Sequence, residues 1–235
     1  GIKMYNERGY VDITASNKLL RTSFTYMILG LLVTFLVPAY IMFSENGFVL
    51  AGYIAKFYTP IIILEFATVL LFSFRIYKVS LMSAKLMFFF YSFLNGLVFS
   101  LIGMMFIGNL MIIAYSLLTT IVMFIVIAVY GYTTNEDLSN YGGYLKTGLI
   151  SLIIMSLINM FLHAPMLYWT VTILGVVIFS ALIAYDVNRI KNMAYEVAEG
   201  DDEIIGKLGI VGALNLYLDF INLFLYIIRI FSKRK

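Results

Sequence analysis

Apolar stretches alternate with short polar separators along the whole chain, and only residues 189–207 form a long polar loop. Each stretch has about 20 residues, which as a helix crosses a hydrocarbon layer of about 30 Å. This pattern predicts an all-α integral membrane protein with seven transmembrane helices. The predicted helices lie near residues 23–43, 56–77, 85–107, 110–132, 146–163, 165–188 and 208–231.

The composition supports the same class, because 62% of the residues are hydrophobic and only 12% are charged. An ordinary soluble domain has an apolar fraction nearer one half. Residues 1–22 are polar and basic, and they predict a cytoplasmic N-terminal tail rather than a signal peptide. Residues 23–235 are then expected to form one transmembrane domain.

Several kinds of chemistry are excluded by residue usage. The chain has no cysteine, which rules out disulfides, thiolate metal sites and thiol nucleophiles. Its only histidine, His163, cannot make a multi-histidine metal site. The net charge is only +3, and the basic residues flank apolar stretches instead of forming a patch for nucleic acid. We therefore expect no resident cofactor, no nucleic-acid partner and no enzymatic activity.

Lysine and arginine indicate the orientation, because these residues accumulate in cytoplasmic loops. Most of them fall in segments that are cytoplasmic if the N-terminus is inside, and we expect this orientation in a plasma membrane. Arg229 and the bases at 233–235 do not fit, because seven crossings place them outside. The last segment could instead re-enter and return to the cytoplasm. We favour a crossing because residues 208–231 are long enough.

Two aspartates, Asp186 and Asp219, interrupt the last two apolar stretches. A charged side chain in hydrocarbon costs several kcal/mol, so an acidic residue there usually marks a functional site. If the two helices pack together, the two carboxyl groups must share a proton or bind a cation between them. Alternatively, Asp186 pairs with Arg189 or Lys191, and Asp219 is a protonated group that holds the bundle together.

Other polar residues fall at matching depths in the predicted helices. Counting about 1.5 Å per residue places Glu65 near the middle of the membrane, and Arg75 near the cytoplasmic end, level with Asp186. In the last helix Asn215, Asp219 and Asn222 share one face because they are spaced i, i+4 and i+7.

The third helix carries a stripe of small residues, Ser92, Gly96 and Ser100, that lets another helix approach closely. Asn95 beside this stripe either packs in a hydrogen bond or lines a pathway. The candidate ion-pathway residues are therefore Glu65, Asn95, Asn215 and Asn222.

Four segments together resemble the Bax inhibitor-1 family of transmembrane proteins. They are YDVNRIK, ALNLYLDFINLFLYIIRIF, FYSFLNGLVFSLI and YGYTTNEDLSNYG, and the resemblance extends from Arg21 through nearly the whole chain. It implies a seven-helix bundle whose last helix is central, wrapped by the other six. Bacterial members are associated with a pH-sensitive calcium leak. Asp186 and Asp219 match the paired aspartates taken as the pH sensor, and Arg75 is similar to an arginine that pairs with them.

The expected function is therefore a pH-sensitive calcium leak channel or a calcium/proton exchanger. Asp186 and Asp219 would form the sensor and a weak, partly hydrated metal site for calcium, which needs several oxygen ligands. Arg75 would act as the gate latch. The expected partners are calcium ions, protons and membrane lipid, and the oligomeric state is open.

Two other classes share features with this sequence. A non-transporting regulatory scaffold is the first, since a sequence does not show that a path opens. An intramembrane aspartyl protease would also carry the pair Tyr185-Asp186, but it requires Gly-x-Gly-Asp at the second aspartate. This chain has leucine at both glycine positions, Leu216 and Leu218.

Overall fold

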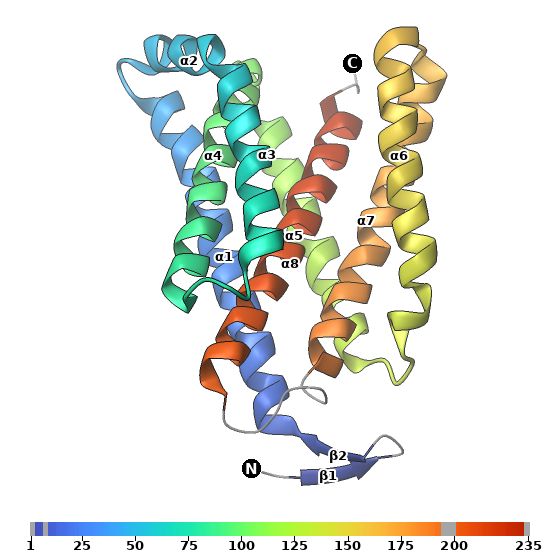
Figure 1. The fold of residues 1–235 in the computed structure, drawn as a ribbon. Coiled ribbons are helices and arrows are strands. Elements are labelled where there is room, and N and C mark those ends of the chain that lie inside the picture. The colour runs from blue at the N-terminus through green and yellow to red at the C-terminus, as the bar shows by residue number, and fades with distance from the viewer. Residues whose placement is uncertain (1–2, 7–8, 194–200, 233–235) are drawn as a thin grey trace. The chain divides into compact units, whose positions relative to one another are not determined.

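The computed structural model describes residues 3–6, 9–193 and 201–232. A short antiparallel hairpin of β1 (Lys3–Asn6) and β2 (Gly9–Asp12) comes first. Helices make up the rest of the described chain (Figure 1). They are α1 (Ile13–Phe43), α2 (Gly47–Lys56), α3 (Tyr58–Arg75), α4 (Leu81–Met105), α5 (Leu110–Thr133), the 3₁₀ helix η1 (Leu138–Tyr141), α6 (Gly142–Leu162), α7 (Pro165–Met193) and α8 (Asp202–Ser232).

Seven of the described helices are long and apolar enough to cross a membrane, which confirms the predicted fold class. The exception, α2, has 10 residues and spans only about 15 Å. The last segment is a single helix that runs past both predicted ends, from Asp202 to Ser232. Its length and composition are therefore those of a crossing helix.

The first helix starts earlier than the predicted range of 23–43, because α1 already begins at Ile13; that residues 1–22 form a cytoplasmic tail stays a prediction. Leu19 and Leu20 explain part of this extension, since both side chains are buried. Hydropathy marks only the part of a helix that crosses hydrocarbon, so it misses turns that continue beyond the apolar layer.

The contacts divide the chain into two compact units. One comprises Asn17–Leu110 and Val197–Tyr217 and is called the α1–α4 unit; the other comprises Gly1–Ser16, Met111–Glu196 and Leu218–Lys235 and is called the α5–α7 unit. Helix α8 contributes its first half to the α1–α4 unit and its second half to the α5–α7 unit. That residues 23–235 form a single domain stays a prediction.

Close helix packing in the α1–α4 unit depends on small residues. A Cβ added at Gly96 of α4 would lie 2.9 Å from the Cβ of Val37 and 3.2 Å from the Thr34 carbonyl oxygen of α1. Ser92 and Ser100 of the same stripe are fully buried. The predicted small-residue stripe is therefore confirmed as a packing face, and α1 is the helix that approaches it.

The first half of α8 is anchored to this unit by buried polar contacts. The Tyr217 hydroxyl lies 2.6 Å from Thr34 Oγ1, and its ring meets those of Phe88 and Tyr91 edge-on. Ser23 Oγ donates to the Gly209 carbonyl oxygen at 2.9 Å. Tyr217 has no exposed surface, so these contacts determine the local position of α8 against α1 and α4.

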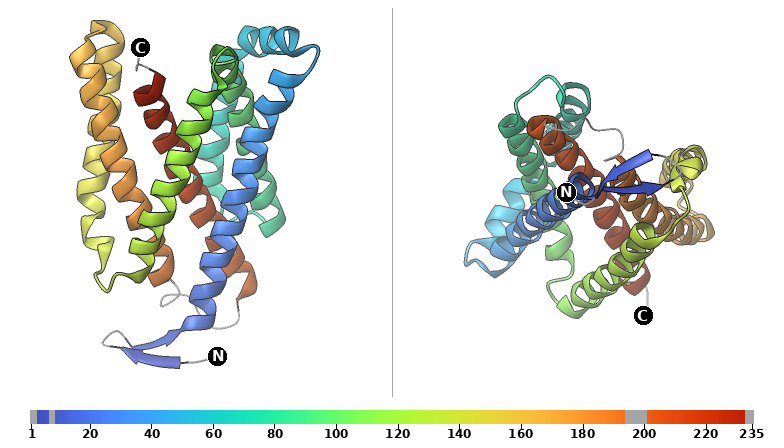
Figure 2. Two further views of the ribbon diagram at one scale, coloured as in Figure 1. Left: turned by 180° about the vertical axis from the view of Figure 1, so that it is seen from behind. Right: turned by 90° about the horizontal axis from the view of Figure 1, so that it is seen from below.

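In the α5–α7 unit, α6 and α7 pack side by side as a helical hairpin (Figure 2). His163 makes the turn between them with a left-handed φ of 50°. The second half of α8 packs through aromatic pairs, Phe124 with Phe220 and Phe179 with Tyr226, at centroid distances of 5.6 and 5.9 Å. These pairs join α8 to α5 and α7.

Burial differs strongly between the candidate spans. In α8, 67% of the apolar window is buried, compared with 6% in the span that ends at Leu162. Many large apolar side chains on the other helices are exposed, as expected of surfaces that face lipid. The central position of α8 remains a prediction, and its high burial is consistent with it.

Helix α5 approaches α7 closely at Gly131, which suggests a test of the packing. A Cβ at this position would lie 2.5 Å from the Ala184 carbonyl oxygen, so Gly131→Ala must push backbone apart. We expect a destabilisation of about 1–3 kcal/mol, seen as a lower melting temperature of the purified protein in detergent. Gly143→Ala in α6 is the control, because nothing lies within 4 Å of its added Cβ. Equal melting temperatures for the two variants would contradict the close approach.

Candidate functional site

Asp186 of α7 and Asp219 of α8 lie together within the α5–α7 unit. Both are buried, with 7% and 4% of their surface exposed, and their carboxyl groups are near enough to act on each other electrostatically. We call these two residues the aspartate pair. The structure thus brings together the two acids that the sequence separates by 33 positions.

Apolar neighbours on both helices hold the aspartate pair away from water. On α7 the buried residues Ile183 and Ile190 share a face with Asp186. Asp219 is similarly flanked on α8 by Leu216, which is fully buried. A hydrogen bond between two carboxyl groups requires that one of them carries a proton. Because Asp219 Oδ2 is buried without a hydrogen-bond partner, it offers a free acceptor to a proton or a cation.

The cation that acts electrostatically on Asp186 is Arg189, one of the two partners considered from the sequence. Arg189 follows Asp186 by three positions, about one helical turn, and its side chain is exposed. Lys191, the other considered partner, donates to the carbonyl oxygens of Tyr132 and Thr134 at 2.8 and 2.9 Å. A basic residue with an exposed side chain, Arg189, therefore lies near the buried aspartate pair.

Asn188 is a central polar residue that the sequence reasoning missed. It is only 1% exposed. Its Oδ1 accepts from the Leu138 N–H at 3.0 Å, and its Nδ2 donates to the carbonyl oxygens of Gly131 and Glu136 at 3.2 and 3.3 Å. These bonds fasten the end of α5 and the following loop to α7, two residues after Asp186. The available signal was an amide inside the motif YDVNRIK, on a helix that is otherwise apolar.

Glu65 and Asn95 belong to the α1–α4 unit. Glu65 on α3 is half-buried, and its Oε2 is buried without a hydrogen-bond partner. Its charge acts on the hydroxyls of Tyr91 and Tyr217. Asn95 is buried, donates to the Tyr91 carbonyl oxygen at 3.3 Å and contacts the Tyr91 hydroxyl. These residues form a second polar group, which we call the tyrosine cluster: Glu65, Tyr91, Asn95 and Tyr217.

The remaining predicted site residues are distributed between the units. Arg75 ends α3 in the α1–α4 unit, its side chain is exposed, and the described residues provide no ion pair for it. Its pairing with the aspartates stays a prediction. On α8, Asn215 belongs to the α1–α4 unit, whereas Asn222 belongs to the α5–α7 unit and donates to the Leu218 carbonyl oxygen at 2.8 Å.

The capacity for metal binding is small. In the ranges the structure describes, no three or more His, Cys, Asp or Glu side chains group together as a metal site. The aspartate pair alone supplies two carboxyl groups, whereas calcium takes six to eight oxygen ligands. A calcium ion there would keep water or use backbone carbonyl oxygens, so the site suits passage better than storage.

Comparison with known proteins identifies a family and several relatives of this chain. Residues 16–235 match the profile of the family described as inhibitor of apoptosis-promoting Bax1. The inner membrane protein YbhL of Escherichia coli strain K12 is 39% identical over 210 residues, which are 89% of each chain. An uncharacterized protein of Borreliella burgdorferi is 38% identical over 226 residues, 95% of each chain. The uncharacterized protein RP147 of Rickettsia prowazekii is 34% identical over 220 residues, 90% of this chain and 88% of its own.

The role of Asn188 can be tested with Asn188→Leu, which keeps the branched side-chain shape but leaves the Leu138 N–H and two carbonyl groups without this partner. Each buried polar group left unpaired costs about 1–3 kcal/mol. We therefore expect a clearly lower melting temperature and faster proteolysis within residues 133–141.

Asn192→Leu is the matched control, because Asn192 only donates to Asn188 Oδ1 at 3.1 Å and its loss leaves the bonds between α7 and the loop in place. If Asn188→Leu and Asn192→Leu melt and are cleaved alike, Asn188 does not fasten the loop.

Proposed function

The chain belongs to the Bax inhibitor-1 family, and from this premise we propose that it lets calcium ions cross the membrane under the control of protons at Asp186 and Asp219. It is a multi-pass membrane protein of a family with inner-membrane members. The proposed transport is either a leak channel or calcium/proton exchange, and it requires no covalent chemistry from the protein.

The observation that supports this proposal is the proximity of two buried carboxyl groups. Helix-centre acids cost about 2.5–3.5 kcal/mol on insertion scales, and two neighbours add mutual repulsion whenever both ionise. Neutralising the pair requires a bound proton or a cation, so protons and calcium compete for the same oxygens. Such competition couples the state of the site to pH.

The gate follows from the charge of the pair. When an aspartate is ionised, it attracts a guanidinium, and we assign the latch to Arg75, with Arg189 as the basic residue beside Asp186. When acid protonates the pair, this attraction is lost and the latch releases. The leak should therefore be low at neutral pH and rise as the pH falls.

Polar residues along α8 line the proposed pathway and coordinate the passing ion. Asn215, Asp219 and Asn222 share one helical face over about 10 Å. The tyrosine cluster adds the unpaired Glu65 oxygen and the Asn95 amide in the α1–α4 unit. We propose that these groups replace part of the hydration of a passing ion, and that the binding stays weak enough for the ion to leave.

For the orientation we propose a plasma membrane location with the N-terminus in the cytoplasm. This arrangement puts most basic residues on the cytoplasmic side. A crossing α8 then places the C-terminus outside.

The direct test is calcium flux into dye-loaded liposomes that contain the purified protein, measured between about pH 5 and 8, where a coupled carboxyl pair titrates. Asp219→Asn removes one titrating group while keeping size and hydrogen bonding. We expect the calcium flux of the wild type to rise roughly tenfold as the pH falls through this range, because binding of one proton per site can account for such a change. The flux of Asp219→Asn should change by less than about twofold.

Asp201→Asn is the control for the aspartate experiment, because Asp201 is exposed and its Oδ1 accepts from the Ile204 N–H, which asparagine can also do. An undiminished pH response in folded Asp219→Asn protein would rule out the sensor. Absence of flux in every protein would instead favour a regulatory scaffold that transports nothing.

Arg75→Ala tests the latch separately. Because the ionised aspartate would lose its partner, we expect calcium leak at pH 7.5 to increase at least roughly tenfold, the equivalent of losing one charge-assisted hydrogen bond. Lys78→Ala is the matched control, since Lys78 is an exposed base three residues further on. A tightly closed Arg75→Ala protein, with normal expression, would show that Arg75 does not hold the gate.

A further inference from the structure

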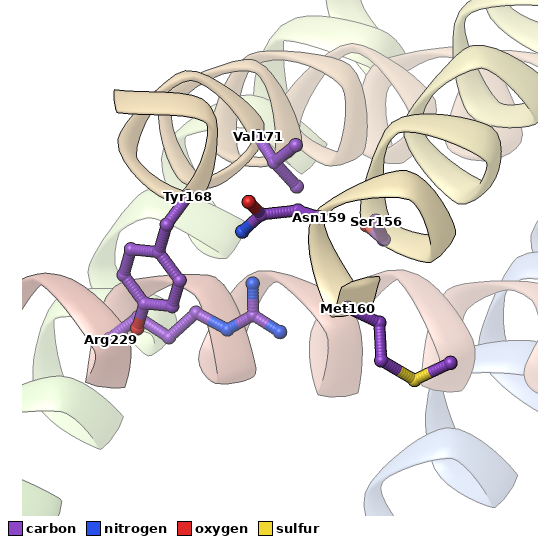
Figure 3. Close-up of a pocket in the computed structure, with 6 residues that line it drawn as sticks. All are labelled: Ser156, Asn159, Met160, Tyr168, Val171 and Arg229. Carbon is purple, nitrogen blue, oxygen red and sulfur yellow. The ribbon is translucent and has the colours of Figure 1, made fainter. Parts of the chain in front are cut away.

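A pocket outside the proposed pathway opens in the α5–α7 unit, where α6 ends, α7 begins and α8 ends (Figure 3). Its volume is about 150 Å³, enough for a phosphate group or several waters of about 30 Å³ each. It is lined by Ser156, Asn159, Met160, Tyr168, Val171 and Arg229. We call it the Arg229 pocket.

Arg229 supplies the positive charge of this pocket. Its guanidinium lies over the rings of Tyr168 and Tyr226, with its carbon 5.4 and 5.0 Å from the centroids. The rings engage the faces of the guanidinium, whereas its N–H donors lie in its plane. No carboxylate forms an ion pair with Arg229 among the residues that the structure describes. The N–H donors therefore remain for a ligand.

Asn159 is oriented to add a further donor. Its Oδ1 accepts the Ala164 N–H at 2.9 Å, so the opposite side of the amide, Nδ2, is the group left for the pocket. In Figure 3 the Asn159 amide and the Arg229 guanidinium lie on either side of the same space, beside the Tyr168 ring. A pocket that presents N–H donors and a fixed positive charge selects an anion.

The surroundings indicate the source of that anion. The end of α6 and the start of α7 expose apolar side chains, with Phe161 79% and Met166 82% exposed. Trp169 follows Tyr168, and both residue types are typical of the membrane interface. A guanidinium matches the geometry of phosphate oxygens, and the exposed apolar rim can accompany acyl chains.

We propose that the Arg229 pocket binds a phosphate group, and that in the membrane this group is the phosphodiester of an anionic phospholipid headgroup. The lipid phosphate forms charge-assisted hydrogen bonds with Arg229 and accepts from Asn159 Nδ2. This anion also neutralises Arg229, the base that lies on the wrong side of the membrane by the charge rule.

Native mass spectrometry of the purified protein tests this proposal, with phosphatidylglycerol, phosphatidylcholine and inorganic phosphate titrated separately. We expect wild-type protein to retain phosphatidylglycerol, and Arg229→Gln to bind it at least roughly tenfold more weakly. Lys146→Gln, an exposed charge near the other end of α6, should bind as the wild type does. Equal retention by the wild type and Arg229→Gln would overturn the site.

A second variant, Asn159→Asp, tests the same site in case Arg229→Gln does not fold. The aspartate keeps an oxygen for the Ala164 N–H, but replaces the donor with a negative charge beside Arg229. This variant should bind phosphatidylglycerol at least as weakly as Arg229→Gln does. Unchanged binding would overturn the site. Retention of inorganic phosphate in preference to both lipids would overturn the lipid assignment.

Discussion

The cost of placing two carboxyl groups in a hydrocarbon-like interior is the constraint on which the rest of this structure depends. Asp186 and Asp219 lie near each other, and two neighbouring carboxyl groups lower that cost when a proton or a cation neutralises one of them. Their proximity requires α7 and α8 to pack closely, and Asn188 fixes the adjoining loop against α7. The proposed response to protons rests on this proximity.

Helix α8 is the element that joins the two polar groups of the molecule. Tyr217, in the tyrosine cluster, and Asp219, in the aspartate pair, are two residues apart on one continuous helix. Tyr217 is bonded to Thr34 of α1, while Phe220 packs on Phe124 of α5. The proposed control by protons would act through Asp219, which belongs to this same continuous helix.

Much of the fold could be predicted because membrane helices have a strong one-dimensional signal. A run of apolar residues of sufficient length must form a helix, since no other single segment satisfies its own backbone in lipid. The helix α2 and the early start of α1 at Ile13 were missed for the same reason, because hydropathy reports the crossing part only. Gly96 and its stripe could be identified as a packing face, but the partner helix could not.

By itself, the sequence determined the class of protein, the number of long apolar helices and the two acids that had to be exceptional, because apolar length and intramembrane charge are local properties. Only the tertiary structure decided that Asp186 and Asp219 lie together, that Asn188 and Lys191 fasten the loop after α5 to α7, and that Arg229, Tyr168 and Asn159 line one pocket. These facts depend on the rotation and register of packed helices. Rotation and register are determined by contacts between distant segments, which no local pattern specifies.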